Sequence, residues 1–316
     1  MYNKYFSKFE GREFRINKSM QWHEYPQMDS YEQHLELRKH DRRKTYANLD
    51  EVHYTYNSFG FRTQEFSLGQ SVDFLSAGCS FTEGIGLREQ DIWDRLIARK
   101  LSASSHISLG AGGAGIETVS RYLSVAVNEM GIKPKIIWVL FPDILRREGF
   151  INNLNFKEPI FNFLPQKPYY EHHKGYTESW KAYVNGLNIK DRIYTLIQQI
   201  ILCANIARSV GATFIWDTWA SHVSTLDIVQ PREMLLSGMV HDQYGLNVFK
   251  MLEHIAPSIV TSTCVNSSPT WITQNDLLDT AYKIYDIEIA RDLGHPGPNA
   301  HYAYAEKAWD FIRDRL

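Results

Sequence analysis

Residues 72–87 read VDFLSAGCSFTEGIGL, and this stretch decides the fold. Its first part is a short apolar run of strand length, and it ends in the small-residue sequence GCSFTEG at 78–84. Small residues around one hydroxyl let the backbone turn sharply and leave that hydroxyl at the carboxyl end of the strand, where open α/β sheets bind their ligands. Ser80 is therefore the candidate nucleophile.

A second polar motif, RDLGHPGPNAH at 291–301, precedes the last helical segment. A serine hydroxyl needs a base within hydrogen-bond reach and a third group that orients the base. Asp292 and His295 supply both from one loop, so we predict that Ser80, Asp292 and His295 are the catalytic residues. His301 is a competing base, but it lies inside the predicted final helix.

Together the two motifs resemble the SGNH (GDSL-like) hydrolase family, of the type found in bacteria and phages, over residues 70–316. Ser80 falls on the family's first block, and Asp292 and His295 fall on its last. The resemblance implies a three-layer α/β/α, flavodoxin-like fold with a mainly parallel sheet. It also implies ester hydrolysis through an acyl-serine intermediate, with no metal and no organic cofactor.

The glycine-rich sequence GAGGAG at 110–115 follows a second predicted strand and precedes a predicted helix from about 116 to 130. Such a turn exposes backbone N–H groups beside a helix N terminus, which suits an anion. The resemblance to the SGNH family implies that the backbone N–H groups of Gly113 and Ser80 bind the oxyanion of the tetrahedral intermediate. The spacing also fits the Gly-x-Gly-x-x-Gly fingerprint of dinucleotide binding, but the loop follows the second strand, and only Glu129, in a helix, lies about 20 positions on.

A third block departs from the family pattern. Residues 135–141, KIIWVLF, have the continuous apolar character of a buried parallel strand and end in Pro142-Asp143. The family has an oxyanion-binding Asn where this chain has Pro142, and proline offers neither an N–H nor a side-chain donor. Loss of one such donor typically costs about 2.7–4 kcal/mol of transition-state stabilisation. Asp143 is a candidate substrate-binding residue at this strand end.

The remaining patterns complete an α/β domain. A helix over 91–101 has Asp91 as its predicted N-cap, and the longest helix spans 188–210. A fourth strand covers 213–219, a further short strand covers 258–265, and a last helix covers 299–316. The stretch YTYNSFGFR at 54–62 reads as a hairpin-like lead-in that covers the sheet.

We predict an irregular N-terminal extension over 1–70 and an SGNH-hydrolase-like α/β domain over 71–316. The domain carries a lid-like insertion at about 150–183, rich in aromatic residues and proline. Tyr169 and Tyr170 in this insertion would suit stacking on sugar rings. The alternative is a loop packed on the protein's own surface.

Composition limits the partners. Of 316 residues 44% are hydrophobic and 22% charged, and the formal net charge of -2 gives no global field that favours nucleic acid or an anionic membrane. No apolar run reaches the ~18 residues of a membrane span, and the N terminus lacks the apolar core of an export signal. Three scattered cysteines have no metal-ligand spacing. We expect a cytoplasmic protein, or a virion protein if the chain is phage-encoded.

The sequence thus favours a serine esterase that removes an acyl group, acetyl for preference, from a small-molecule or carbohydrate ester. The alternative is a weakly active or inactive SGNH-like scaffold that acts as a structural or binding protein, for example in a phage virion. In that case the N-terminal extension is the surface for a protein assembly partner.

Overall fold

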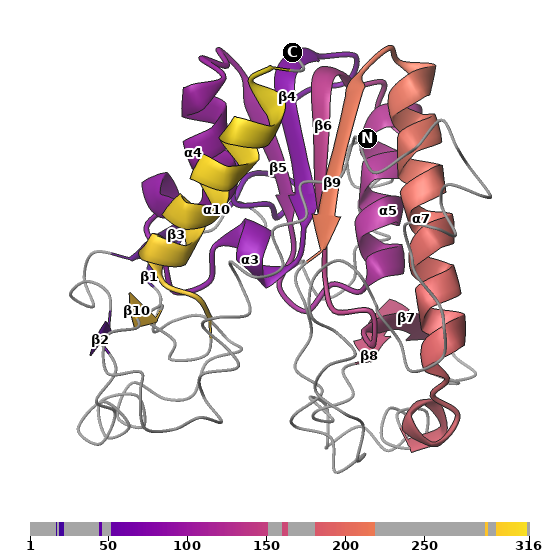
Figure 1. The fold of residues 1–316 in the computed structure, drawn as a ribbon. Coiled ribbons are helices and arrows are strands. Elements are labelled where there is room, and N and C mark those ends of the chain that lie inside the picture. The colour runs from indigo at the N-terminus through magenta and orange to yellow at the C-terminus, as the bar shows by residue number, and fades with distance from the viewer. Residues whose placement is uncertain are drawn as a thin grey trace.

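A four-stranded parallel sheet forms the centre of the computed structural model, which describes residues 52–150, 160–163, 181–218, 288–289 and 295–314, with short pieces at 17, 19–21 and 44–45. The sheet consists of β4 (Ser71–Gly78), β5 (His106–Gly110), β6 (Lys133–Phe141) and β9 (Thr213–Thr218). Their order is β5-β4-β6-β9, so the first strand of this sheet lies between the second and the third (Figure 1). This order confirms the predicted parallel α/β fold.

The register aligns the carboxyl ends of the strands. Gly78 of β4 lies beside both Gly110 of β5 and Leu140 of β6, and Leu140 lies beside Asp217 of β9. The loops that leave these strands therefore start at one edge of the sheet, where open α/β folds bind ligands.

Helices cover both faces of the sheet and give the predicted three layers (Figure 1). One face carries α4 (Trp93–Lys100) and α10 (Pro298–Ile312), and the other carries α5 (Ile116–Ser124) and α7 (Ile189–Ser209). The short helical elements are α3 (Ser80–Glu83), a 3₁₀ turn (Glu89–Asp91) and a π-helical turn (Val125–Glu129).

Three two-stranded pairs accompany this sheet in the described residues. β1 (Ser19–Gln21) pairs antiparallel with β3 (His53–Thr55), and β7 (Arg147–Phe150) pairs antiparallel with β8 (Ile160–Phe163). β2 (Lys44–Thr45) pairs in parallel with β10 (Glu288–Ile289). The predicted strand at 258–265 lies outside the described residues.

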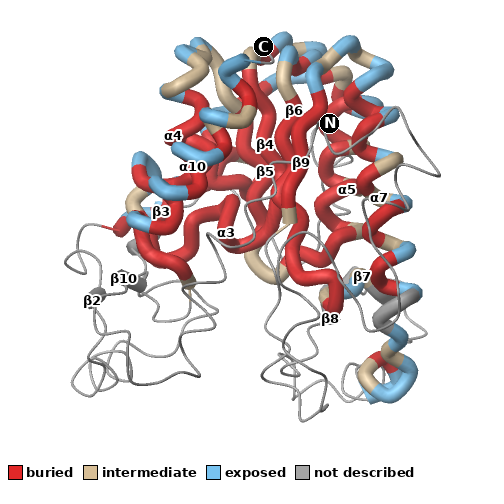
Figure 2. The backbone as a smooth tube through the Cα atoms, viewed as in Figure 1, coloured by how far each residue is buried: buried red, intermediate tan, exposed pale blue. Residues whose placement is uncertain are grey.

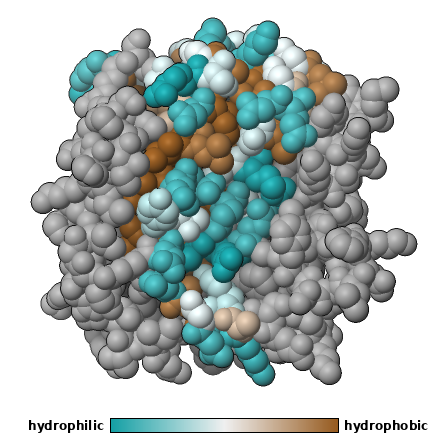
Figure 3. All heavy atoms as spheres, turned by 90° about the vertical axis from the view of Figure 1, so that its right-hand side faces the viewer, coloured by the Kyte–Doolittle hydropathy of each residue, from teal (hydrophilic) through white to brown (hydrophobic). Residues whose placement is uncertain are grey.

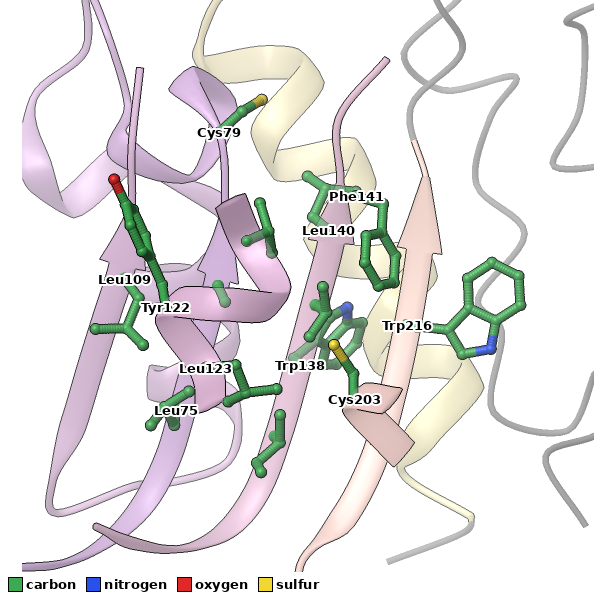
Figure 4. Packing of buried hydrophobic residues seen from close by; sticks show 14 of the residues in the cluster. Leu75, Cys79, Leu109, Tyr122, Leu123, Trp138, Leu140, Phe141, Cys203 and Trp216 are labelled. Carbon is green, nitrogen blue, oxygen red and sulfur yellow. The ribbon is translucent and has the colours of Figure 1, made fainter. Parts of the chain in front are cut away.

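Burial on both faces explains the apolar run of β6. Its last five residues are all buried because helices lie above and below them (Figure 2). Figure 4 shows Trp138 and Leu140 of β6 within this core, together with Cys203 of α7, which lies on the face that α5 and α7 cover and donates to Ser120 Oγ at 3.4 Å. On the other face, Trp138 Nε1 donates a hydrogen bond of 3.1 Å to the Tyr304 hydroxyl of α10. Burial raises the pKa of the Cys203 thiol to about 12, which keeps it protonated.

The outer surface is of mixed character. Seen from the side of α7, the described surface is largely hydrophilic with a band of hydrophobic residues (Figure 3). Tyr194 and Leu202 of α7 are exposed, while Ile193, Ile197 and Ile200 face the core. No described helix is long and apolar enough to cross a membrane.

The start of α4 differs from the prediction. The predicted N-cap, Asp91, instead ends a 3₁₀ turn, and Ile92 occupies the N-cap position without a side-chain bond. The Asp91 carboxylate accepts hydrogen bonds from Arg88 at 2.8 Å and from the Tyr302 hydroxyl at 3.1 Å. The Asp91 carboxylate therefore links the segment that precedes α4 to α10 and does not cap α4.

The lead-in at 54–62 also differs in part, because β3 pairs with the distant β1 and does not form a tight hairpin. Its aromatic side chains nevertheless pack into the same core as β4, and the buried ones between 52 and 66 are Tyr54, Tyr56, Phe59, Phe61 and Phe66. The domain division at residue 70 stays a prediction, with aromatic core residues on its N-terminal side.

A buried polar cluster joins α4 to the sheet. The fully buried Asp94 accepts hydrogen bonds from Ser76 Oγ at 2.6 Å and Ser108 Oγ at 2.7 Å, and it pairs with Arg95. Burial alone would raise the pKa of Asp94, but Arg95, His106 and the two hydroxyls together lower it. His106 Nε2 lies 3.1 Å from Ser76 Oγ, and burial lowers its pKa to about 4.

This cluster predicts a pH-dependent stability. The unfolded His106, with an ordinary pKa of 6.5, takes up a proton below that pH, whereas the folded side chain stays neutral down to about pH 4. The free energy of unfolding should therefore fall as the pH drops, with a His106 share of about 2 kcal/mol at pH 5. Urea unfolding at pH 7 and pH 5 measures this, and His106→Gln should remove that share. An unchanged pH dependence in His106→Gln would contradict the assignment.

Candidate active site

Ser80 is the first residue of α3, directly after the strand β4, and is 3% exposed. Gly78 makes this turn: a Cβ there would lie 2.0 Å from Thr82 Oγ1 and 2.9 Å from the Leu140 carbonyl oxygen. Any larger residue at position 78 would push α3 away from the sheet. Ser80 Oγ donates a hydrogen bond of 3.8 Å to Cys79 Sγ. The sequence-predicted nucleophile thus lies at the carboxyl edge of the central sheet.

The glycine-rich loop lies directly against the serine turn. A Cβ on Gly110, at the end of β5, would come within 2.4 Å of the Glu83 backbone nitrogen. Ala111 N–H donates to the Gly78 carbonyl at 3.0 Å, which ties the loop to the end of β4. The two loops are therefore packed at backbone contact, and only glycine permits that approach at 110.

Residues 111–114 form a tight turn that isolates one N–H group. Ala114 N–H donates to the Ala111 carbonyl at 3.0 Å, and Gly113 has φ +78°, as the third residue of a type II turn requires. Gly112 N–H donates to Glu83 Oε2. In the described part of the chain, the hydrogen bonds use the N–H of Ala111, Gly112 and Ala114 but not that of Gly113.

Two backbone N–H groups of these packed loops, those of Ser80 and Gly113, are the candidates for an oxyanion site. Like that of Gly113, the N–H of Ser80 is used by no hydrogen bond among the described residues. Backbone donors of this kind stabilise a tetrahedral oxyanion because they are fixed before charge develops.

His295 is brought to the serine turn from the far end of the chain. Its ring lies edge-on to the ring of Phe81, the neighbour of Ser80, with centroids 5.8 Å apart and an interplanar angle of 74°. Among the described residues no hydrogen bond joins Ser80 Oγ to His295. Asp292, the predicted third member, lies outside the described residues, as do Tyr169 and Tyr170.

The competing base, His301, has a different role. It lies in α10, is 1% exposed, and its Nδ1 accepts the Trp93 N–H at 3.1 Å. Burial lowers the pKa of His301 to about 3, with opposing effects from nearby charges. A side chain so weakly basic and already bonded to backbone joins α10 to α4 and does not suit proton transfer near neutral pH.

The third block is held in place by hydrogen bonds from its own turn and from α7. Pro142 is buried directly after β6, and the Asp143 Oδ1 accepts the Leu145 N–H at 2.8 Å. Arg192 of α7 donates to the Ile144 carbonyl at 2.8 Å and pairs with Glu117 at 2.6 Å. Asp143 therefore stabilises its own turn, and its predicted contact with substrate stays a prediction.

Sequence reasoning missed two buried charged residues at this site. Glu83 is 1% exposed and accepts hydrogen bonds from the Tyr56 hydroxyl at 2.9 Å and from Gly112 N–H. Arg62 is 1% exposed and covers the Tyr54 ring at 4.3 Å. The motif NSFGFR at 57–62 was the only sequence feature that pointed to either residue, because it marks the segment that supplies Arg62.

Arg62 binds the backbone that follows the nucleophile. Its Nη1 donates to the carbonyls of Glu83 at 3.2 Å and Gly84 at 2.7 Å, and its Nη2 donates to that of Leu87 at 2.8 Å. These carbonyls lie at or beyond the C-terminal end of α3, where a cation is favoured. Arg62 thus holds the lead-in segment and the serine turn together.

The geometry does not favour the dinucleotide alternative. The loop follows β5, at the edge of the central sheet, and the Glu83 carboxylate already binds its Gly112 N–H. A phosphate placed there would meet a like charge. Within the described ranges, no group of three or more His, Cys, Asp or Glu side chains is placed to hold a metal ion.

No protein-family model matches this chain, and a comparison with curated proteins gives no match. Among solved structures, the chain is similar to a member of the lipolytic protein G-D-S-L family from Veillonella parvula DSM 2008. The TM-score is 0.44 at 11% identity, over 77% of this chain and 99% of that one.

Two further similarities are to TesA, with TM-score 0.42 at 13% identity, and to the acetyl xylan esterase AlAXEase, with TM-score 0.40 at 12% identity. They cover 78% and 76% of this chain, and 100% and 99% of those chains.

Proposed function

We propose that this protein is a carboxylic ester hydrolase with Ser80 as its nucleophile. The observation that carries the proposal is the meeting of three parts from distant segments: the serine turn after β4, the Gly113 N–H in the loop after β5, and the His295 ring against Phe81. Nucleophile, oxyanion donor and base are the parts that acyl transfer requires.

In the proposed mechanism, His295 takes the proton of Ser80 Oγ as the oxygen attacks the ester carbonyl carbon. The N–H groups of Ser80 and Gly113 bind the resulting oxyanion, and Asp292 orients the His295 ring. Collapse of the tetrahedral intermediate breaks the bond to the alcohol oxygen, which receives the proton from His295. Water then attacks the acyl-serine by the same route, releasing the carboxylic acid and restoring Ser80.

The proposed substrate is an acetyl ester on a carbohydrate, and Asp143, Tyr169 and Tyr170 are its proposed contacts. Support comes from the aromatic composition of 150–183 and from the place of Asp143 two positions beyond the end of β6. We propose a cytoplasmic site of action, or a place in the virion for a phage-encoded chain.

One observation favours the alternative of an inactive scaffold. Pro142 is buried at the strand end where the family's Asn donates to the oxyanion, and it has no donor to offer. Two backbone donors without a third would leave the oxyanion less stabilised by about 2.7–4 kcal/mol. On this alternative, the N-terminal extension binds a protein assembly partner.

A fluorophosphonate probe and an aryl acetate assay separate the two proposals. We expect the probe to modify Ser80 in the folded protein, located by peptide mass spectrometry, and Ser80→Ala to abolish both labelling and hydrolysis. Circular dichroism establishes that the variant is folded. Folded wild-type protein that neither reacts with the probe nor hydrolyses the ester would overturn the hydrolase proposal and support the scaffold.

A further inference from the structure

Glu83 is a buried carboxylate three positions beyond Ser80, at the last residue of α3. A buried charge is retained only where hydrogen bonds offset the loss of hydration. It lies among residues of the candidate site, yet it has no place in the catalytic steps proposed above. Its contacts indicate what it does there.

The Glu83 carboxylate connects three segments that are separate in sequence. One oxygen, Oε1, accepts the Tyr56 hydroxyl at 2.9 Å, from the lead-in that follows β3. The other, Oε2, accepts the backbone N–H of Gly112 in the loop after β5. The residue itself belongs to the serine turn after β4. A charged acceptor forms stronger hydrogen bonds than a neutral one, so these contacts resist displacement.

The contact with Gly112 fixes the donor next to it. Gly112 and Gly113 are the two central residues of the turn from Ala111 to Ala114, closed by the 3.0 Å bond between its ends. The first residue of the turn is held by the Gly78 carbonyl and the second by Glu83. Because Ala111 and Gly112 are both held, the direction of the Gly113 N–H depends on the type of the turn. The φ of +78° at Gly113 sets that turn type.

We infer that Glu83 is a positioning residue that sets the Gly113 N–H relative to Ser80 Oγ. The inference rests on the proposed ester hydrolase function and adds a residue to its site. Glu83 touches neither the substrate nor the reacting atoms. It acts through the glycine loop, and the distance between nucleophile and oxyanion donor is the quantity that it controls.

Three substitutions at Glu83 separate the effect of the side chain's position from the effect of its charge. Glu83→Ala removes the bridge and should lower kcat for an aryl acetate by about 10- to 10²-fold with KM little changed, because misplacement of about 1 Å can cost 10²-fold. Glu83→Asp keeps the charge but draws the carboxylate back by one methylene, so it should also lose rate. Glu83→Gln keeps an acceptor for Gly112 N–H and a donor for the Tyr56 oxygen, so it should retain kcat within about 3-fold.

Ser76→Ala is the matched control for lost stability. Ser76 lies in β4 and donates to the buried Asp94, so the variant loses one buried hydrogen bond without touching the glycine loop. It should be destabilised with unchanged kcat. The rate of phosphonylation of Ser80 gives a second readout, since the phosphonyl oxygen occupies the oxyanion position.

The outcomes are distinguishable. A wild-type protein that is inert to both probe and ester overturns the hydrolase proposal and this inference with it. An active wild type overturns the inference alone if Glu83→Ala and Glu83→Asp keep full kcat, or if Ser76→Ala loses kcat to the same extent. Should Glu83→Ala fail to fold, the comparison of Glu83→Asp with Glu83→Gln decides.

Discussion

Replacing His295 with alanine is expected to lower kcat/KM for an aryl acetate by about 10⁴-fold while the fold is retained. The serine hydroxyl loses the base that takes its proton, and what remains is the stabilisation by backbone donors and substrate binding. His295 is only partly buried and its ring lies edge-on to that of Phe81, so its loss should cost little stability. Initial rates over a range of substrate concentrations, with thermal unfolding as the check on folding, measure both effects.

His301→Asn is the control for this experiment. The Asn side-chain oxygen can accept the Trp93 N–H in place of His301 Nδ1, so α10 stays joined to α4. Full activity is expected in this variant. If His301→Asn loses as much rate as His295→Ala, or if His295→Ala keeps it, the assignment of the base is wrong.

Replacing Arg62 with alanine is expected to lower the free energy of unfolding by about 4 kcal/mol. The change strips the carbonyls of Glu83, Gly84 and Leu87 of a charged donor inside the protein, and each such group left unsatisfied costs about 1–3 kcal/mol. It also empties the space over the Tyr54 ring. Urea unfolding followed by tryptophan fluorescence measures the change.

Two further variants test the cause. Arg62→Lys keeps the charge but cannot reach several carbonyls at once, because an ammonium lacks the planar fork of a guanidinium, so it should recover only part of the loss. Arg99→Ala removes an exposed arginine whose Nη2 donates to the Gln90 carbonyl at 2.8 Å, and it should change stability by no more than about 0.5 kcal/mol. Equal effects of Arg62→Ala and Arg99→Ala would contradict the role given to Arg62.

The elements of the sheet were predictable from sequence because their signals are local. The apolar run of 135–141 gave β6, and the run before GCSFTEG gave β4 and the serine turn. Gly113 was singled out only through the family resemblance, as an oxyanion donor, and the structure gives it the positive φ that only glycine adopts freely.

The polar contacts of the site were not predictable in the same way. Glu83 and Arg62 are charged residues, and residue type alone places such side chains on the surface. Their burial follows from tertiary contacts with Gly112 and with the carbonyls of the serine turn, which leave no periodic pattern. Asp91 shows the converse: an ordinary capping signal gave way to contacts with Arg88 and Tyr302.

The docking of α10, the helix that follows the proposed base His295, has a consequence for synthesis. α10 is joined to α4 by the bond from Trp93 N–H to His301, across 208 positions, and by the ion pair of Lys100 with Glu306. A ribosome therefore releases the serine turn and the glycine loop long before it releases His295. Under the proposed function, the nascent chain would carry the proposed nucleophile and oxyanion donors without the proposed base, so its esterase activity would stay latent until α10 emerges and docks.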